Sequence, residues 1–377
     1  MTHHPPLLMI AGIEGAIATT LTVAMAALGQ GQSGIAASLT TADRFAQLGP
    51  LAEARVVGWD RQLAGVPAAI ERHGVLAAEI WSPYQGVLAQ VPIQSAPDTA
   101  LGLRGQVEKI SRDMARFRES FPGHMPVLIN LLPAAVNCDL DHCADVESIL
   151  AAGDGEALPD LAYVMAAIEA GVAVVNFTPN RVEFPALLER AGQQQVPVCG
   201  RDGKTGQTYL KVVLASALKA RALVVDGWYS TNILGNADGR NLQDPRRSAG
   251  KIENKTDLLN GILGYRVGQN YGEPAHTVRI DYYPPRGDAK EAWDVIDFKG
   301  LFGLPMSLRL NWQGRDSILA APMVLDLARW AVALQLAGRA GAIAELGFFF
   351  KKPVGDDPPL TFEAQLAALA RLERQCG

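Results

Sequence analysis

Short apolar runs alternate with longer helical patterns through the first 200 residues of the chain. The apolar runs are rich in Val, Ile and Leu, which predicts buried strands at residues 7–11, 54–58, 126–130, 172–177 and 196–199. Helices are predicted between them, at 19–28, from just after 60 to about 78, at 157–170 and at 181–191. Such an alternation is typical of an α/β fold with a mostly parallel sheet and helices on both faces.

The pattern changes after residue 200. A helix is expected at 205–219, followed by strands at 223–225, 276–283 and 306–311. The last two strands alternate polar and apolar residues, which indicates a mixed sheet with one open or partner-covered face. The stretch 317–336 is an Ala/Leu-rich helix that is apolar nearly all round, as expected in a core or between subunits, and the final helix at 362–375 is amphipathic.

The chain has no flexible linker to mark a domain boundary, so interleaved domains are expected. We predict a Rossmann-type dinucleotide-binding domain formed by residues 1–199 plus 318–377. An inserted α+β domain, formed by residues 200–317, is expected to carry the catalytic site and the contacts between subunits.

The segment from Gly12 to Ala16 follows the first predicted strand and precedes the first helix. A strand, a glycine turn and a helix form the start of a dinucleotide-binding unit, which makes Gly12, Gly15 and Ala16 candidate cofactor residues. Glu14 stands where the backbone of such a turn approaches a pyrophosphate. On the glycines alone, an ordinary turn of an α/β protein explains the segment equally well.

Composition and charge exclude several classes of protein. The 377 residues are 49% apolar, and the formal net charge is −5 with no basic run longer than Arg246-Arg247, which argues against a nucleic-acid surface. Four cysteines in a chain of this size indicate a reduced, cytoplasmic protein. Residues 7–28 are long enough to span a bilayer, but Glu14 and several glycines interrupt them and no Lys or Arg precedes them, so no membrane role is expected.

Lysine is distributed unevenly. Nine of the ten lysines lie between residues 204 and 352, although arginine supplies most of the 34 basic residues. The pKa of a lysine falls readily on burial, so it can exchange a proton where arginine cannot. Any one of Lys251, Lys255, Lys290 and Lys351 could be a surface residue, but their grouping favours a site that moves protons beside a phosphate or a carbonyl.

Three polar, glycine-rich stretches lie in the same region, at 200–211 (GRDGKTGQTYLK), 230–242 (STNILGNADGRNL) and 287–290 (GDAK). In the first, backbone amides at a helix start could hold an anion, with help from Lys204 and Thr205. In the second, side-chain amides and carboxylates crowd around two glycines more densely than a turn requires. These stretches are therefore candidate binding loops.

Together with the K-x-x-x-K of 251–255 and RDSILAAPMVLD at 315–326, these stretches resemble the myo-inositol-1-phosphate synthase family in sequence and in order. Asn176-Phe-Thr-Pro179 and Gly58-Trp59-Asp60 resemble two further family motifs. The resemblance implies an enzyme that converts glucose 6-phosphate to inositol 1-phosphate with NAD that is regenerated in each cycle. Position 5 is oxidised, an enolate forms at position 6, an internal aldol reaction closes the ring, and the hydride returns.

The resemblance also implies a role in catalysis or substrate binding for each of the four lysines. A developing enolate and an aldehyde oxygen need positive charge and a proton source in a dry cavity. The resemblance places Lys251 and Lys351 near the position-5 oxygen, and Lys255 and Lys290 near the phosphate and the position-1 oxygen.

The resemblance also implies binding residues. The expected cofactor residues, beyond the glycine turn, are Asp60 on the adenosine side and Asp202, Thr205, Asn236, Asp238, Gly287, Asp288 and Asp316. The expected substrate residues are Lys204, Gly206, Gln207, Asn232, Leu234, Asn236, Lys255 and Lys290. NAD is expected rather than NADP, because Glu14 and Asp60 would repel a 2′-phosphate.

The family assembles as a tetramer, so a cytoplasmic homotetramer acting on a small sugar phosphate is expected, with no nucleic-acid or membrane partner. The sequence leaves open whether a divalent metal or a monovalent cation is needed. Two other classes remain open: an NAD(P)-dependent dehydrogenase of a phosphorylated sugar or a related cyclitol synthase, and a non-catalytic dinucleotide-binding protein, which the altered glycine turn suggests.

Overall fold

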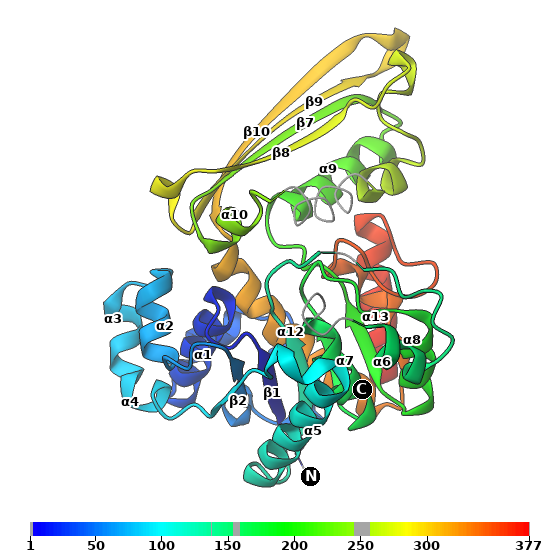
Figure 1. The fold of residues 1–377 in the computed structure, drawn as a ribbon. Coiled ribbons are helices and arrows are strands. Elements are labelled where there is room, and N and C mark those ends of the chain that lie inside the picture. The colour runs from blue at the N-terminus through cyan, green and yellow to red at the C-terminus, as the bar shows by residue number, and fades with distance from the viewer. Residues whose placement is uncertain (1–2, 137, 154–158, 245–256, 377) are drawn as a thin grey trace.

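The larger of two sheets is a seven-stranded parallel sheet of the Rossmann type, seen in a computed structural model that describes residues 3–136, 138–153, 159–244 and 257–376 (Figure 1). Its strand order is β11-β6-β5-β4-β1-β2-β3. The strands are β1 (Pro6–Ala11), β2 (Arg55–Asp60), β3 (Ile93–Ser95), β4 (Met125–Asn130), β5 (Ala173–Asn176), β6 (Pro197–Gly200) and β11 (Gly341–Ala342). The strand order reverses between β1 and β4, which is where ligands bind in open α/β sheets, beyond the carboxyl ends of the strands.

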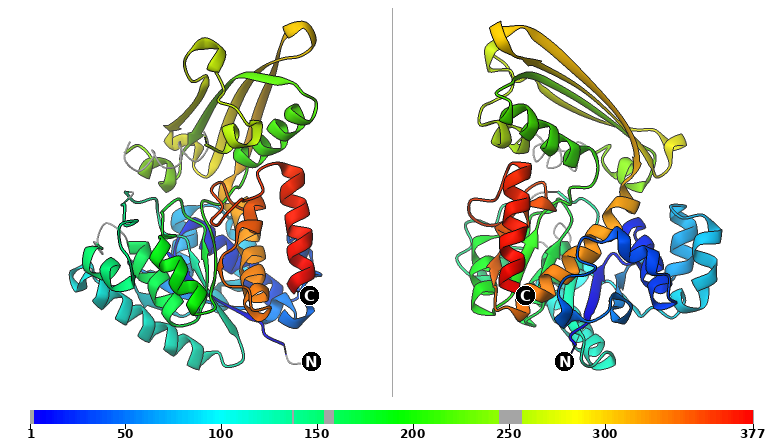
Figure 2. Two further views of the ribbon diagram at one scale, coloured as in Figure 1. Left: turned by 90° about the vertical axis from the view of Figure 1, so that its right-hand side faces the viewer. Right: turned by 180° about the vertical axis from the view of Figure 1, so that it is seen from behind.

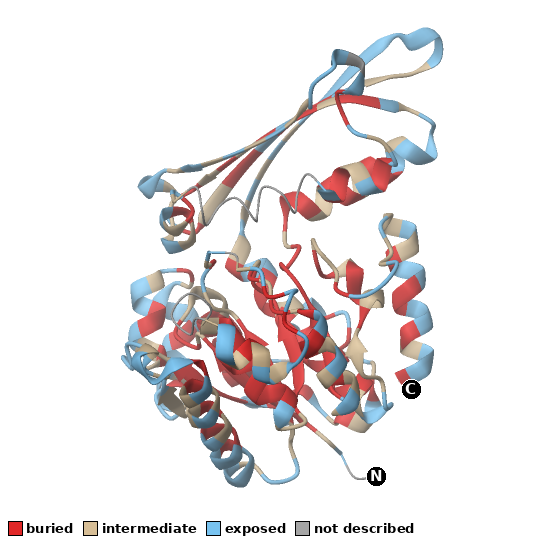
Figure 3. Cartoon of the chain, turned by 45° about the vertical axis from the view of Figure 1, so that its right-hand side comes forward, coloured by how far each residue is buried: buried red, intermediate tan, exposed pale blue. Residues whose placement is uncertain are grey.

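Helices cover both faces of this sheet, as the buried strands predicted. The side chains of β1 alternate: Leu8 and Ile10 join one hydrophobic core cluster, whereas Leu7 and Met9 join the other. The first cluster contains residues of α1 (Ala16–Gly29), α12 (Asp316–Leu336) and α13 (Phe362–Cys376). The second contains residues of α5 (Gly102–Ser120), α7 (Pro159–Glu169) and α8 (Pro185–Gln193). Figure 3 shows these buried layers in red.

The two most apolar segments of the sequence are core elements of this layer. Residues 7–28 contribute to β1 and α1, whose side chains are mostly buried. Helix α12 is long and apolar enough to cross a membrane, but 78% of that apolar window is buried inside the protein. The prediction that 317–336 forms a buried helix is confirmed.

The second sheet is mixed and has four strands in the order β10-β9-β7-β8. They are β7 (Val224–Leu234), β8 (His276–Tyr282), β9 (Ala289–Lys299) and β10 (Pro305–Arg315). Helix α9 (Gln207–Ala220) packs on its inner face, where Trp228 and Ile296 are buried, while Tyr229 and Trp293 on the outer face are about half exposed. Figures 1 and 2 show this layer beyond the carboxyl ends of the large sheet, with α12 leading back from β10.

Shorter helices complete the described fold: α2 (Val66–His73), α3 (Ala78–Trp81), α4 (Gln85–Leu88), α6 (Val146–Ala152) and α10 (Ala237–Asn241). Helices α2 and α4 pack against α1. The single helix expected between about 60 and 78 is therefore wrong in length, because residues 61–65 form a loop and α2 begins only at Val66, with Pro67 in its first turn.

Three further predictions need correction. Strand β7 continues to Leu234, so residues 230–234 belong to a strand and not to a loop. Strand β9 was not predicted, because charged residues interrupt its apolar alternation. Helix α8 begins at Pro185, four residues later than expected, because Phe184 is extended and proline fits the first turn of a helix.

Candidate functional site

The turn between β1 and α1 lies at the point where the strand order reverses. Gly12 has φ +85°, and a Cβ added there would lie 3.2 Å from the carbonyl oxygen of Leu131. The first N–H groups of α1 have no partners within the helix, so they can bind an anion at the carboxyl edge of the sheet. The turn therefore has the form of a phosphate-binding turn even without a third glycine.

Glu14 is directed into the protein. Its side chain is fully buried, Oε1 accepts a hydrogen bond from the Gly65 amide at 2.7 Å, and Oε2 lies 3.6 Å from Arg72 Nη2. Its own amide donates to Oδ2 of Asp60 at 2.9 Å. Glu14 and Asp60 thus join the glycine turn to the segment after β2, and the Glu14 carboxylate is occupied by contacts inside the protein.

A pocket lies between the two sheets, under the inner face of the four-stranded sheet. Its lining residues are Thr205, Gln207, Thr208, Asn232, Leu234, Asp238, Leu242, Ile280, Lys290, Asp316 and Lys351. Most of them were selected from the sequence. Thr208, Leu242 and Ile280 were not, since each reads as an ordinary helix or strand residue.

Asp316, at the start of α12, connects two of the predicted binding stretches. Its Oδ2 accepts from Lys290 Nζ at 3.1 Å, and its Oδ1 accepts from the Thr205 hydroxyl at 3.0 Å. Burial by itself would raise the pKa of Asp316, but the ammonium groups of Lys290 and Lys351 lower it. Asp316 is therefore a carboxylate held ionised beside the pocket.

Lys351 and Lys352 point in different directions. Lys351 lines the pocket, where its ammonium donates to Asp202 Oδ1 at 2.6 Å. Lys352 is 40% exposed and its ammonium lies 3.4 Å from Asp257. Of the two adjacent lysines, Lys351 is therefore the one that can contact a ligand in the pocket.

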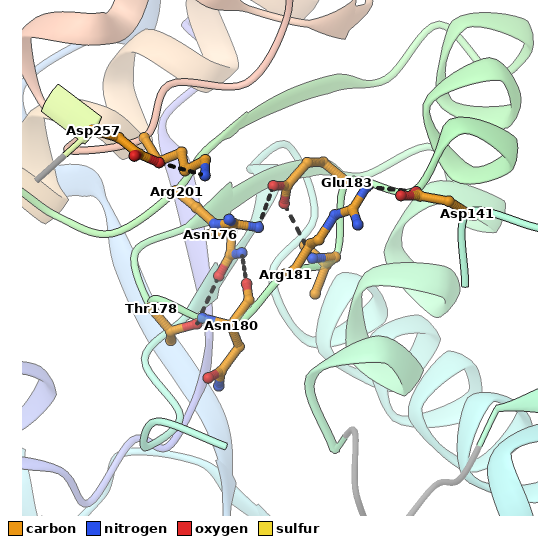
Figure 4. A network of polar contacts seen from close by, with 10 residues as sticks. Asp141, Asn176, Thr178, Asn180, Arg181, Glu183, Arg201 and Asp257 are labelled. Atoms are coloured by element: carbon orange, nitrogen blue, oxygen red, sulfur yellow. Dashed lines mark hydrogen bonds and ion pairs between the residues drawn. The ribbon is translucent and has the colours of Figure 1, made fainter. Parts of the chain in front are cut away.

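Figure 4 shows a polar network that includes Asn176, Thr178 and Arg201, at the ends of β5 and β6. The Thr178 hydroxyl donates to Asn176 Oδ1 at 3.0 Å, and the Asn176 amide donates to the Asn180 carbonyl at 2.7 Å. The Asp202 amide in turn donates to the Thr178 carbonyl at 2.9 Å. Beside it Arg201 pairs with Glu183. The Asn-Phe-Thr-Pro motif therefore positions the Asp202 backbone.

Gly235 and Gly287 bring the second and third binding stretches together. The Gly235 amide donates to the Gly287 carbonyl at 3.2 Å, and a Cβ on Gly235 would lie only 2.3 Å from the Gly287 amide nitrogen. Next to this contact, Asp288 accepts from Ser317 at 3.1 Å and from Asn236 at 3.4 Å. Burial raises the pKa of Asp288. Ser317 was not predicted from the sequence, although it directly follows Asp316 in a matched motif.

Asn232 projects from β7 into the pocket. It is 1% exposed, and within the described part of the chain neither its amide nitrogen nor its amide oxygen has a hydrogen-bond partner. A buried amide without partners is costly, so it is expected to bind a ligand that both donates and accepts.

Two residues expected to bind substrate are placed differently. The Lys204 ammonium is buried and donates to the Gly347 carbonyl at 3.0 Å and to Gln365 Oε1 at 2.9 Å, away from the pocket lining. Burial, together with the nearby Lys351, lowers the pKa of Lys204 to about 7. A Cβ on Gly206 would lie 2.2 Å from the Trp312 ring, so tight packing accounts for this glycine.

The remaining predicted residues form two groups. Gly12, Glu14, Gly15, Ala16 and Asp60 lie around the glycine turn. Leu234 ends β7, Asn236 and Asp238 lie at the start of α10, and Gly287 precedes β9. Lys251 and Lys255 lie outside the described residues.

Fold and pocket together define a Rossmann-type protein whose second sheet covers a pocket of lysines and carboxylates. The family model for myo-inositol-1-phosphate synthase matches residues 206–317. Inositol-3-phosphate synthase 1 of Bacteroides thetaiotaomicron is 45% identical over 200 residues, which cover 52% of this chain and 47% of that protein. The Homo sapiens inositol-3-phosphate synthase 1 is 29% identical over 342 residues, covering 84% of this chain and 58% of that protein.

The crystal structure of inositol-3-phosphate synthase from Caenorhabditis elegans has the same fold, with a TM-score of 0.87 and 19% identity over 99% of this chain and 86% of that one. The resemblance to the myo-inositol-1-phosphate synthase family, predicted from the sequence, is confirmed. The chain spans about half the length of the curated relatives that it matches.

Proposed function

We propose that the protein catalyses the NAD-dependent, redox-neutral cyclisation of glucose 6-phosphate to myo-inositol 1-phosphate. The observation that carries this proposal is the pocket itself, in which Lys290 and Lys351 are each paired with a carboxylate, beside Asn232, whose side-chain amide has no hydrogen-bond partner among the described residues. Cations, acids and a neutral hydrogen-bonding group in one cavity match a sugar phosphate whose oxygens gain charge during the reaction.

The glycine turn and Asp60 fit an NAD molecule. Gly12 keeps the turn free of a Cβ, the start of α1 offers amides to a pyrophosphate, and Asp60 ends β2, where an acidic residue binds an adenosine ribose. NAD would supply the group that takes a hydride from the sugar and gives it back. This arrangement supports residues 1–199 plus 318–377 as the NAD domain and 200–317 as the catalytic and subunit-contact domain.

Lys351 is proposed to exchange the proton of the position-5 oxygen. Asp202 fixes its ammonium from one side, and the ammonium is also close enough to Asp316 to lower the pKa of that carboxyl group. Lys290 is proposed to hold the substrate phosphate and the position-1 oxygen. The resemblance assigns Lys251 and Lys255 to the same cavity.

The outer face of the four-stranded sheet supports a homotetramer. Tyr229 of β7 and Trp293 of β9 are 44% and 49% exposed there. Exposed apolar side chains gathered on one sheet face favour contact with another protein surface. A solution mass near four times 40.2 kDa would support the tetramer, whereas a 40.2 kDa species would contradict it.

The experiment that tests the function follows glucose 6-phosphate by ³¹P NMR with the purified protein and a small, substoichiometric amount of NAD. The proposal predicts complete conversion to an inositol phosphate with no accumulation of NADH. A dehydrogenase would stop after consuming the NAD, and a non-catalytic protein would bind NAD without any turnover.

A further inference from the structure

A buried polar network lies directly behind the pocket, on the inner face of the four-stranded sheet. Asp294 of β9 is 3% exposed and lies opposite Ser230 of β7 in the sheet register. Its Oδ1 accepts from the Trp228 indole at 2.7 Å and from the Ser230 hydroxyl at 2.5 Å. Its Oδ2 accepts from the side-chain amide of Gln207 at 2.8 Å.

Gln207 connects this network to the pocket, which it lines from the first position of α9. A side-chain amide has a donating nitrogen and an accepting oxygen on opposite sides, whereas an ionised carboxylate only accepts. Asp294 can therefore bond Gln207 only through its nitrogen, which turns the amide oxygen to the other side.

We propose that Asp294 is a positioning residue: it fixes the amide of Gln207 in one orientation, so that Gln207 presents its oxygen to a hydroxyl group of the bound sugar. The inference rests on the proposed function for the identity of that sugar. Asp294 itself does not line the pocket, so it would act on the substrate only through Gln207.

The charge of Asp294 is balanced by Lys211, which is 2% exposed and comes from the second turn of α9. Its ammonium donates to the Ser230 hydroxyl at 3.1 Å, lies 2.7 Å from His276 Nε2 and sits over the Trp228 ring at 5.2 Å. Burial lowers the pKa of Lys211 to about 8, against the opposing effect of Asp294. The Lys211 ammonium is thus linked to the Asp294 carboxylate through the Ser230 hydroxyl.

The position of Gln207 in the pocket lining distinguishes a positioning role of Asp294 from a role in stabilising the sheet alone. Trp228 and Ser230 satisfy one oxygen of the carboxylate, and Lys211 bonds Ser230, so these contacts stay inside the domain. Among these contacts of the described residues, the bond to Gln207 is the one that leads from the carboxylate to a residue lining the pocket. Its loss should therefore affect substrate binding and not only stability.

The test is a double-mutant cycle of Asp294→Asn, Gln207→Glu and the double variant. In Asp294→Asn, the oxygen can still accept from Trp228 and Ser230, but the new amide nitrogen faces Gln207 and forces its amide to turn over. In the double variant that nitrogen donates to the carboxylate introduced at position 207, whose second oxygen again faces the pocket. Asp226→Asn is the matched control, since Asp226 is a buried carboxylate of β7 that pairs with Lys299 and does not line the pocket.

Thermal unfolding tests the contact without any substrate. We expect both single variants to melt below the wild type and the double variant to recover much of the loss. If the losses simply add, the proposed orientation is overturned whatever the substrate is.

Steady-state kinetics with glucose 6-phosphate test whether the hydrogen bond between Asp294 and Gln207 contributes to substrate binding. We expect KM to rise about tenfold in Asp294→Asn, with a smaller change in kcat, and to return toward the wild-type value in the double variant. Asp226→Asn should keep the wild-type KM. An unchanged KM in Asp294→Asn overturns the positioning role. A wild type that never turns over glucose 6-phosphate, yet shows the thermal coupling, contradicts the proposed function and leaves the orientation standing.

Discussion

Lys351 and Asp202 are joined twice. The Lys351 ammonium donates to Asp202 Oδ1 at 2.6 Å, and the Lys351 main-chain amide donates to the Asp202 carbonyl at 2.8 Å. The two residues are 149 positions apart in the chain. Because the backbone contact fixes the base of the side chain and the carboxylate fixes its tip, the ammonium has one defined position at the pocket.

Lys351→Arg should lower kcat by on the order of a hundredfold, because arginine keeps the charge but has neither the compact shape nor the accessible pKa for proton transfer. NAD binding should stay close to that of the wild type. Lys352→Arg is the control, since Lys352 is 40% exposed and pairs with Asp257. Equal turnover in both variants would show that Lys351 acts only through its charge.

Lys290→Ala should weaken substrate binding. The contact between a lysine and a substrate phosphate exists before and during the reaction, so a large part of the loss should appear in KM. The measurement compares glucose 6-phosphate with glucose, which lacks the phosphate. If the variant discriminates between the two sugars as strongly as the wild type does, Lys290 does not bind the phosphate.

NAD should raise the melting temperature at millimolar concentration, because Glu14 lies inside the protein and leaves the amides of the glycine turn available. NADP should give a smaller shift, since Asp60 would repel a 2′-phosphate. Glu14→Ala removes the acceptor of the Gly65 amide and the partner of Arg72, and it should reduce the NAD shift. An equal shift with both nucleotides would contradict the assignment of Asp60.

Lys204 should make stability depend on pH. Its pKa is lowered from 10.5 to about 7 in the folded protein, so between these values the unfolded chain binds more protons and stability rises with pH. Lys204→Met removes this term. The free energy of unfolding of the wild type relative to Lys204→Met should therefore increase from pH 7 to pH 9.5, by at most about 1.4 kcal/mol per pH unit. A difference that stays constant over this range would show that Lys204 keeps an ordinary pKa.

The large sheet was predictable because its central strands are buried on both faces, so each appears as an apolar run. The second sheet was harder to predict, since β9 places Asp294 on its inner face between Ala292 and Ile296, which breaks the apolar alternation. The same interruption is the one signal in the sequence that could have identified Asp294.

The order of the motifs predicted which stretches would meet at the pocket, but not where each side chain would point. The sequence placed both Lys204 and Lys351 at the binding site. The fold directs one ammonium to the Gly347 carbonyl and the other to the pocket, because the amides of Asp202 and Lys204 donate to the carbonyls of Thr178 and Phe349 and so fix the backbone there. Such long-range contacts have no local sequence signal.

The central claim is that the hydride leaves position 5 of the sugar and returns to it within one turnover. Glucose 6-phosphate labelled with deuterium at position 5 tests this claim most directly, with unlabelled NAD present in small amount and the product analysed by mass spectrometry. The account predicts an inositol phosphate that retains the deuterium, with almost none in free NADH. Deuterium that accumulates in NADH, or a product that has lost it to water, would contradict the account.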